Sequence, residues 1–358
     1  MYAKQLASQV SPPPATRARR LILHAGMQKT GSTSIQHFLD AATLQDARYF
    51  KGPQPNHSLL FMLLFGDSPE AHRTHRLHGR GREQILHLRD AQMAEIAAEL
   101  DASDIDVYVF SGERISKSTR NELERSLAFF SRWFSQIDVY AYIRSPVNFA
   151  ASMFQQHLKF GTLPTIPNIL AGYRRRVENM DAVFGRDHVH LRAFDAEGAP
   201  IPDITPDFLT WAGFEATGNA RGPRNLSLSA EATALLYAVR FRLNRNLNSP
   251  TEVQLWNTLV RQAQDIGDQK YSFSPDIFGK RRTELLEDHA WTEERLGQRF
   301  PDPLATNAAR LQFSSLEEIR KLGLQIFKNR TGKRLNKLNE GGPLQLRRLV
   351  KLLEPRAS

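Results

Sequence analysis

One segment decides how the chain is expected to fold: His24-Ala25-Gly26-Met27-Gln28-Lys29-Thr30-Gly31-Ser32-Thr33-Ser34. The residues that lead into it, 20–24, are a short apolar run of the kind found in buried parallel strands. After it, apolar side chains recur with the spacing of one helical face, at Ile35, Phe38, Leu39 and Ala42. The segment therefore predicts a strand, a glycine-containing loop and a helix in direct succession.

The predicted loop carries groups that bind an anion. A turn from a strand into a helix presents backbone N–H groups and the positive end of the helix dipole. Lys29 adds a positive charge, and hydroxyl donors follow at Thr30, Ser32, Thr33 and Ser34. A polar turn with a capping serine explains Gly31 and Ser32 taken alone. Lysine, glycine and four hydroxyls at one strand–helix junction instead predict a phosphate site.

The rest of the chain alternates between apolar runs and helical patterns. Strands are predicted over 105–110, 137–143 and 188–194, and helices over 121–136, from Ser145-Pro146 onward, and over 168–184. This alternation predicts an α/β fold, with a parallel central sheet flanked by helices and a P-loop-like strand–loop–helix nucleotide site. Beyond about residue 215 the pattern predicts a helical C-terminal part, clearest over 229–243.

A second polar segment follows the strand over 137–143. That strand ends in Arg144, and Ser152 lies eight positions further along the predicted helix. Ser145 and Ser152 are two helical turns apart and share a face. A guanidinium fork suits a phosphate, so Arg144 and Ser152 together favour a second phosphate contact. An ordinary helix start with a small buried serine explains the same residues when they are taken alone.

Two other functions compete with the interpretation that follows. The kinase loop G-x-x-x-x-G-K-[ST] has its lysine after the second glycine, whereas here Lys29 precedes Gly31. An ATP-dependent kinase also needs a metal-holding aspartate at a strand end, and Asp106 and Asp138 lie near the beginnings of their predicted strands. The second alternative is a non-catalytic module that binds a nucleotide or a glycan.

Together the two segments resemble those of sulfotransferases that use PAPS (3'-phosphoadenosine 5'-phosphosulfate), whose first motif is K-[TS]-G-[ST]-[TS]. The longer string HAGMQKTGSTSIQ resembles the bacterial, carbohydrate-directed branch of that family. The resemblance covers the two segments directly and extends over residues 20–215 through the strand–helix alternation. It implies transfer of a sulfuryl group from PAPS, the co-substrate, to an acceptor hydroxyl.

The resemblance also implies a role for each matching residue. Lys29 would contact the oxygen that bridges sulfate and phosphate, and the residues that hold the 5'-phosphate would be Thr30, Gly31, Ser32, Thr33 and Ser34. Arg144 and Ser152 would bind the 3'-phosphate. The stretch Arg224-Asn225-Leu226-Ser227-Leu228-Ser229 is similar to a third family segment, in which Arg224 would complete the nucleotide site, although a helix cap at Ser229 explains it equally well. No metal is expected, because Lys29 and the helix end already meet the anion.

An acceptor hydroxyl needs a base, and the sequence leaves two candidates open. His57 precedes the apolar run 59–65 and has a side chain suited to proton transfer near neutral pH. Its alternative role is to cap the following helix. Glu113 follows the second predicted strand, at the sheet edge where ligands of parallel sheets bind. Its alternative role is that of a solvated turn carboxylate, and His24 is expected to be structural.

Composition and charge limit the class of protein. The 358 residues contain no cysteine, which excludes disulfides, a thiolate zinc site and a cysteine nucleophile. Nine Lys/Arg against two Glu between 328 and 356 account for +7 of the net charge of +10. Because the remaining +3 is small, we expect no nucleic-acid partner. The predicted organisation is a flexible leader (1–19), a sulfotransferase-like α/β domain (20–325) and a basic C-terminal extension (326–358).

The expected partner is a glycan or glycolipid acceptor, and the expected location is the cytoplasm. The basic residues of 344–353 alternate with leucines in a helical pattern. This pattern predicts a docked terminal helix or, as a second hypothesis, a peripheral contact with an anionic inner membrane face. The arginine- and histidine-rich stretch 71–90 shows no periodicity and is expected to be a surface loop.

Overall fold

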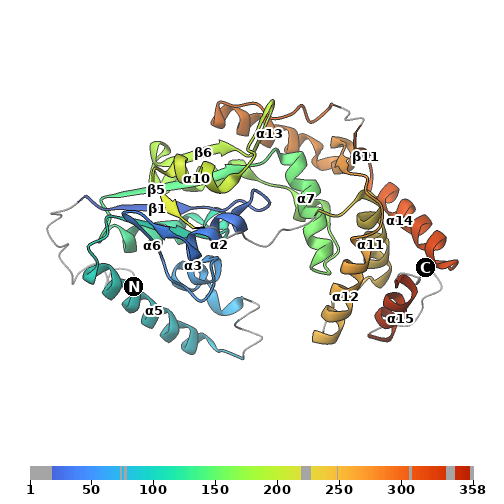
Figure 1. The fold of residues 1–358 in the computed structure, drawn as a ribbon, viewed down its shortest axis with the longest axis horizontal. Coiled ribbons are helices and arrows are strands. Elements are labelled where there is room, and N and C mark those ends of the chain that lie inside the picture. Colours follow the sequence, from blue (N-terminus) through green and yellow to red (C-terminus); the bar gives the residue numbers. More distant parts are fainter. Residues whose placement is uncertain are drawn as a thin grey trace. The chain divides into compact units, whose positions relative to one another are not determined.

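The computed structural model describes residues 18–72, 75, 79–218, 227–247, 249–305, 309–335 and 343–354 (Figure 1). Its strands are β1 (Arg20–His24), β2 (Thr43–Leu44), β3 (Ala47–Tyr49), β4 (Val107–Ser111), β5 (Gln136–Ile143), β6 (Val189–Ala193), β7 (Asp195–Ala196), β8 (Ala199–Pro200), β9 (Ala216–Thr217), β10 (Tyr271–Phe273) and β11 (Leu311–Phe313).

The α-helices are α2 (Ser32–Ala41), α3 (Ser58–Phe65), α5 (Arg82–Ala102), α6 (Arg120–Phe130), α7 (Pro146–Lys159), α8 (Ile166–Ile169), α9 (Tyr173–Phe184), α10 (Ile204–Ala212), α11 (Ala230–Leu243), α12 (Pro250–Ala263), α13 (Arg282–Leu296), α14 (Leu316–Thr331) and α15 (Pro343–Leu353). Short 3₁₀ helices are η2 (Pro69–Ala71), η3 (Ile115–Lys117), η4 (Arg186–His188) and η5 (Pro275–Arg281).

The chain forms two compact units. The first takes its described residues from Met1–Ile143, Tyr173–Phe194 and Pro200–Pro223, and the second from Arg144–Gly172, Asp195–Ala199 and Arg224–Ser358. Residue 325, where the composition suggests a boundary, lies inside α14. None of the described helices is both long and apolar enough to cross a bilayer.

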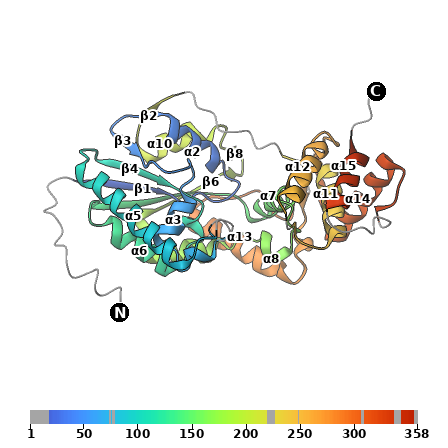
Figure 2. The ribbon, with the colours of Figure 1, turned by 90° about the horizontal axis from the view of Figure 1, so that it is seen from below.

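A parallel sheet in the order β3-β4-β1-β5-β6 forms the centre of the first unit. Helices cover both faces of this sheet (Figure 2), and successive side chains of each strand point to opposite faces. One face, with Ile22, Val109 and Tyr142, packs against α2 and α10. The other face contacts a cluster of aromatic rings from α3 and α6, among them Phe61, Phe65 and Phe130, through Phe110. The predicted α/β class, with its strand–loop–helix opening, is confirmed.

Parallel pairing decides where the loops lie. Because β4 and β5 flank β1 on either side and run in its direction, the carboxyl ends of all three strands meet at one sheet edge. In open parallel sheets, ligands bind outside this edge. The loops that follow β1 and β4 therefore converge within the first unit.

The second unit is mainly helical, as the sequence predicts for its C-terminal part. Helix α11 is buried along most of its length and packs against α14, α12 and α7. The terminal helix α15 buries Leu346, Leu349 and Leu353 and packs against α12. The docked-helix prediction is therefore confirmed.

Some expected elements have different bounds. Helix α6 ends at Phe130, not 136, because Ser131 begins a turn into β5. The single helix expected over 168–184 is two, α8 and α9, with Gly172 at a positive φ of 57° between them. The prediction of a surface loop over 71–90 is wrong for its second half, because α5 begins at Arg82. This helix buries only Ile85, Ile96 and Leu100, so it shows no apolar stripe.

One glycine sets how closely two helices approach in the second unit. A Cβ placed on Gly323 of α14 would lie 2.0 Å from the carbonyl oxygen of Ala234 in α11. We expect Gly323→Ala to cost about 3 kcal/mol through overpacking and to regain about 1 kcal/mol of helix propensity. The net loss of about 2 kcal/mol lowers the melting temperature by about 4–8 °C.

Calorimetry or circular dichroism measures the shift, with Lys321→Ala on the exposed side of α14 as the control. That control should change stability by less than about 0.5 kcal/mol. Equal melting temperatures for the two variants would contradict the close packing of α11 on α14.

Candidate functional site

The loop between β1 and α2 leaves the end of a helix open. Helix α2 begins at Ser32, and no side chain caps it. Its N-cap residue Gly31 has a φ of 80°, and Lys29 also lies in the left-handed region at 67°. Thr30 Oγ1 and Ser32 Oγ both donate to the Met27 carbonyl, at 2.6 and 3.2 Å, which closes the loop on itself. The first N–H groups of α2 therefore have no capping side-chain oxygen, and such groups at a helix start can bind an anion.

Gly26 allows this loop to touch the neighbouring one. A Cβ on Gly26 would lie 2.8 Å from Ser32 Oγ and 3.5 Å from Cγ of Glu113. Glu113 belongs to the loop after β4. In the same segment, Ser116 Oγ donates to the Glu113 carbonyl at 2.9 Å and to the Gly26 carbonyl at 3.5 Å. The structure thus brings two sequence-predicted residues, Lys29 and Glu113, to one place within the first unit.

The charge on Glu113 is set by its surroundings. Burial raises the pKa of this carboxyl, and the cations Lys117, Lys29 and Arg176 oppose that shift. Lys117 is the last residue of η3, and Arg176 belongs to α9. The pKa of Lys117 is lowered to about 8, mainly by burial and in part by Arg176, while Glu113 opposes the shift. A carboxylate with a raised pKa beside three cations is a group suited to accepting a proton.

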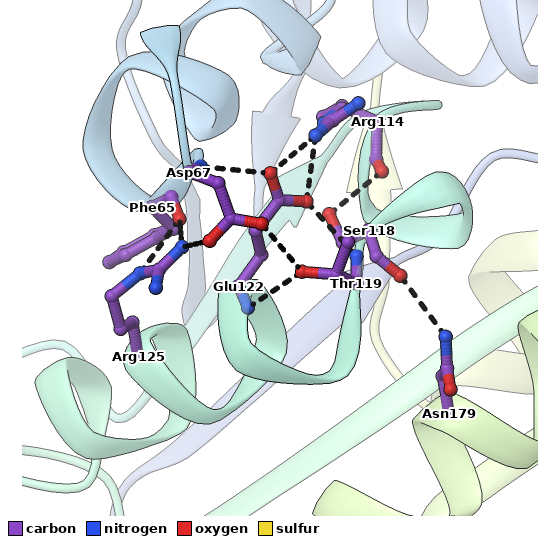
Figure 3. A network of polar contacts seen from close by, with 8 residues as sticks. All are labelled: Phe65, Asp67, Arg114, Ser118, Thr119, Glu122, Arg125 and Asn179. Atoms are coloured by element: carbon purple, nitrogen blue, oxygen red, sulfur yellow. Dashed lines mark hydrogen bonds and ion pairs between the residues drawn. The ribbon is translucent and has the colours of Figure 1, made fainter.

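A buried carboxylate, Glu122 of α6, holds the loop that carries Glu113 (Figure 3). It accepts both bonds from Arg114 Nη2, at 2.5 and 2.7 Å. It also accepts from the backbone N–H groups of Thr119, at 3.0 Å, and Asp67, at 3.1 Å. The residues 114–119 are therefore attached to α6 and to the end of α3. Because Glu113 directly precedes Arg114 in the chain, this anchoring also restricts the position of Glu113.

His57 lies in a different environment. It is 1% exposed, its ring stacks on Tyr49 at 4.5 Å, and its Nδ1 accepts from the Ser111 N–H at 3.1 Å. Burial lowers its pKa to about 4, although the Phe50 carbonyl opposes the shift and Lys51 adds to it. It occupies the N-cap position of α3 but makes no side-chain capping bond. The ring is neutral, with its proton on Nε2.

His24 is also buried at this edge. Its Nδ1 lies 2.7 Å from Ser111 Oγ, and burial lowers its pKa to about 3. Gln36 of α2 donates to the same hydroxyl at 3.2 Å. These contacts tie β1, β4 and α2 together, which is the structural role expected for His24.

The second predicted segment belongs to the second unit, where a carboxylate sits at the start of α7. Asp195 accepts from the Ser145 N–H at 2.7 Å, and from Ser145 Oγ at 3.3 Å. It also accepts from Asn148 Nδ2 at 2.7 Å, and its Oδ2 lies 3.6 Å from Nε of Arg144. Arg144 and Ser145 are thus oriented by an internal anion at a helix N-terminus.

One turn after Ser152, Gln155 ties α7 to a distant segment of the same unit. Its Oε1 accepts from the Leu228 N–H at 3.1 Å and from Ser227 Oγ at 3.2 Å, while its Nε2 donates to the Leu228 carbonyl at 3.1 Å. Residues 227 and 228 of the predicted third segment are therefore attached to α7 one turn after Ser152. Arg224 itself lies outside the described residues, and Ser229 caps α11 through the Ala232 N–H at 2.9 Å.

Sequence reasoning missed Lys117, Arg176 and Asp195. Lys117 follows Glu113 by four positions on the loop after β4, a place that could have suggested it. Arg176 is one of three successive arginines, and Asp195 is 50 positions from Ser145, so neither carries a local signal. Within the described part of the chain, no three His, Asp or Glu side chains are arranged to hold a metal ion.

Replacing Glu122 tests whether it holds the site. In Glu122→Gln, Arg114 loses its counter-charge in a half-buried position, and we expect stability to fall by about 3 kcal/mol, the low end for a broken buried pair. Backbone amides of residues 112–119 should exchange hydrogen faster. Urea unfolding and hydrogen-exchange mass spectrometry measure these effects.

The control is Glu124→Gln, which breaks the exposed pair of Glu124 with Arg120 on the same helix. This change should cost less than about 1 kcal/mol. Unchanged exchange over 112–119 in Glu122→Gln would show that the carboxylate does not position the loop.

Comparison with known proteins gives structural neighbours only. No family model and no curated protein matches the chain. The structure is similar to the crystal structure of a sulfotransferase from Alicyclobacillus acidocaldarius, at 16% identity and a TM-score of 0.39, covering 64% of this chain and 98% of that one. It is also similar to the sulfotransferase domain from the Synechococcus PCC 7002 olefin synthase, at 13% identity and a TM-score of 0.37, covering 79% of this chain and 98% of that one. At this level of similarity neither neighbour assigns an activity to this chain. An assignment of function must rest on the residues of the site itself.

Proposed function

We propose that the chain transfers a sulfuryl group from PAPS to a hydroxyl of an acceptor. One observation carries the proposal: the uncapped start of α2, with Lys29 in its loop, lies beside a carboxylate whose pKa is raised by burial. An anion site and a proton acceptor next to each other are what in-line transfer from an anionic donor to an alcohol requires.

On the donor side, the β1–α2 loop would hold the 5'-phosphosulfate. The N–H groups at the start of α2 and the hydroxyls of Thr33 and Ser34 suit the 5'-phosphate, while the hydroxyls of Thr30 and Ser32 hold the loop in shape. Lys29 would contact the bridging oxygen, on which negative charge grows as the S–O bond breaks. A cation fixed at that atom stabilises the transition state more than the ground state.

On the acceptor side, the geometry favours Glu113 over His57 as the base. Glu113 lies against Gly26 and acts electrostatically on Lys29, whereas His57 is enclosed by aromatic rings and its Nδ1 already accepts a hydrogen bond. In the proposed step, the acceptor oxygen bonds to sulfur, its proton passes to Glu113, and the S–O bridge breaks. The nucleotide leaves as PAP (3',5'-adenosine bisphosphate).

The resemblance also implies a contact to the 3'-phosphate of the nucleotide. The resemblance gives Arg144 and Ser152 to the 3'-phosphate, and Asp195 fixes the backbone where Arg144 meets α7. Gln155 attaches residues 227 and 228 beside Ser152. The resemblance to the carbohydrate-directed branch makes a glycan or glycolipid the proposed acceptor.

PAP binding tests the donor side. Isothermal titration calorimetry should show that PAP binds and that ATP with Mg²⁺ binds more weakly. Lys29→Gln should weaken PAP binding about tenfold to a hundredfold, because it removes a charge-assisted hydrogen bond. Lys321→Gln, an exposed lysine of α14, serves as the control and should leave the affinity unchanged. Absence of PAP binding, or a preference for ATP, would sink the proposal.

The pH dependence of transfer tests the base. Because burial raises the pKa of Glu113 above its ordinary 4.5, the carboxyl is protonated and inactive at low pH, and kcat/KM should rise with pH through the raised value. Glu113→Gln should abolish this rise, the low-pH limb of the profile, and should lower turnover about 10²–10⁴-fold. Its affinity for PAP should be unchanged or higher.

The assay is transfer of labelled sulfate to acceptors found in a glycan screen. His57→Gln provides the comparison and should keep the limb. If the low-pH rise of kcat/KM persists in Glu113→Gln and disappears in His57→Gln, then His57 and not Glu113 is the base.

A further inference from the structure

The outward side of the terminal helix α15 carries cations. Its inward side, with Leu346, Leu349 and Leu353, packs against α12 and α14 within the second unit. Four exposed residues lie at one position and at three, four and seven positions after it, so they form a single helical face. They are Leu344, Arg347, Arg348 and Lys351.

Helix α14, which contacts α15, adds further cations at its own end (Figure 1). Lys328 and Arg330 lie in its last turn, and Lys333 and Arg334 follow just after the helix. All four are exposed. Neither α15 nor this end of α14 contains a carboxylate. The exposed cations of the two helices are called the basic surface below.

Neighbouring carboxylates leave most of the basic surface unneutralised. Within the described part of the chain, no ion pair involves the cations of 328–334, Arg347 or Lys351. By contrast, Arg320 near the start of α14 is paired with Glu317. A surface that carries one sign of charge attracts a partner of the opposite sign. The partner of the basic surface is therefore an anion with many charges.

An exposed leucine at one end of the α15 face indicates which anionic partner fits. Leu344 is 63% exposed and lies one turn before Arg347 and Arg348. Cations beside an apolar side chain suit a bilayer surface, where the cations meet phosphate headgroups and the leucine enters the boundary of the acyl chains. A nucleic acid would meet the same cations, but it offers no apolar layer to Leu344.

We propose that the outward face of α15 and the end of α14 attach the chain to the surface of an anionic bilayer. The contact is mainly electrostatic, because the leucine-rich side of α15 stays packed against α12. It would hold the chain on the surface where a glycolipid acceptor is anchored. The inference goes beyond the proposed sulfuryl transfer and does not depend on it.

Vesicle binding tests the attachment. The full chain is floated with vesicles of phosphatidylcholine, either alone or mixed with about one third phosphatidylglycerol. It should bind the anionic vesicles at least about tenfold more tightly than the neutral ones. Because salt screens exposed charges, high ionic strength should remove most of this binding.

The double variant Arg347→Gln, Lys351→Gln should weaken binding to the anionic vesicles about tenfold to thirtyfold, since each cation near such a surface strengthens binding about fivefold. Leu344→Gln should weaken it about threefold. The matched control is Lys280→Gln, Arg281→Gln, which removes two exposed charges from η5 of the same unit. This control should keep the affinity. Circular dichroism should show the same melting temperature for both double variants, because all four side chains are exposed.

Several results would overturn the inference. These are equal binding of the neutral and anionic vesicles, no binding to either, or the same loss of affinity in the two double variants. A DNA duplex at equal phosphate concentration is the competing partner. If the chain binds it more tightly than the anionic vesicles, and Leu344→Gln changes neither affinity, the basic surface belongs to a nucleic acid and not to a bilayer.

Discussion

The parallel pairing of β1 with β4 and β5 is the constraint on which the rest depends. It brings the loop that carries Lys29 and the loop that carries Glu113 to one sheet edge. The two loops approach closely because Gly26 has no side chain, and a methyl group there would meet Ser32 and contact Glu113. The proposed anion site and the proposed base both follow from this one strand arrangement.

Burial acts differently on the two candidate bases. For Glu113, burial disfavours the charged form, but three cations keep ionisation within reach, so the group can exchange a proton. For His57, burial and a backbone donor hold the ring neutral, while Tyr49 and Phe110 enclose it. The same physical effect therefore makes one residue suited to chemistry and gives the other the features of a structural side chain.

The sequence predicts the elements whose pattern is local. The apolar run of β1 and the amphipathic face of α2 were recognisable, because each buries a continuous face in a regular period. Helix α5 escaped prediction because it buries only three of its 21 residues, and β3 because it has three residues. Periodicity cannot detect elements that bury so little.

The residues of the candidate site likewise divide into those that the sequence predicts and those that it does not. Lys29 and its hydroxyls form a contiguous motif, and Glu113 follows a strand whose end could be predicted. Arg176 acts electrostatically on Lys117 because α9 packs against η3, and Asp195 reaches Ser145 across 50 positions. Such tertiary contacts have no signature in a single sequence, since they depend on how separate elements pack.

A crystal structure of the chain with PAP bound tests the central claim most directly. The account predicts that the 5'-phosphate lies at the N-terminus of α2, within hydrogen-bond distance of the Ser32 N–H and the Lys29 ammonium group. A 5'-phosphate bound anywhere else on the chain, with the start of α2 left to solvent, would contradict it.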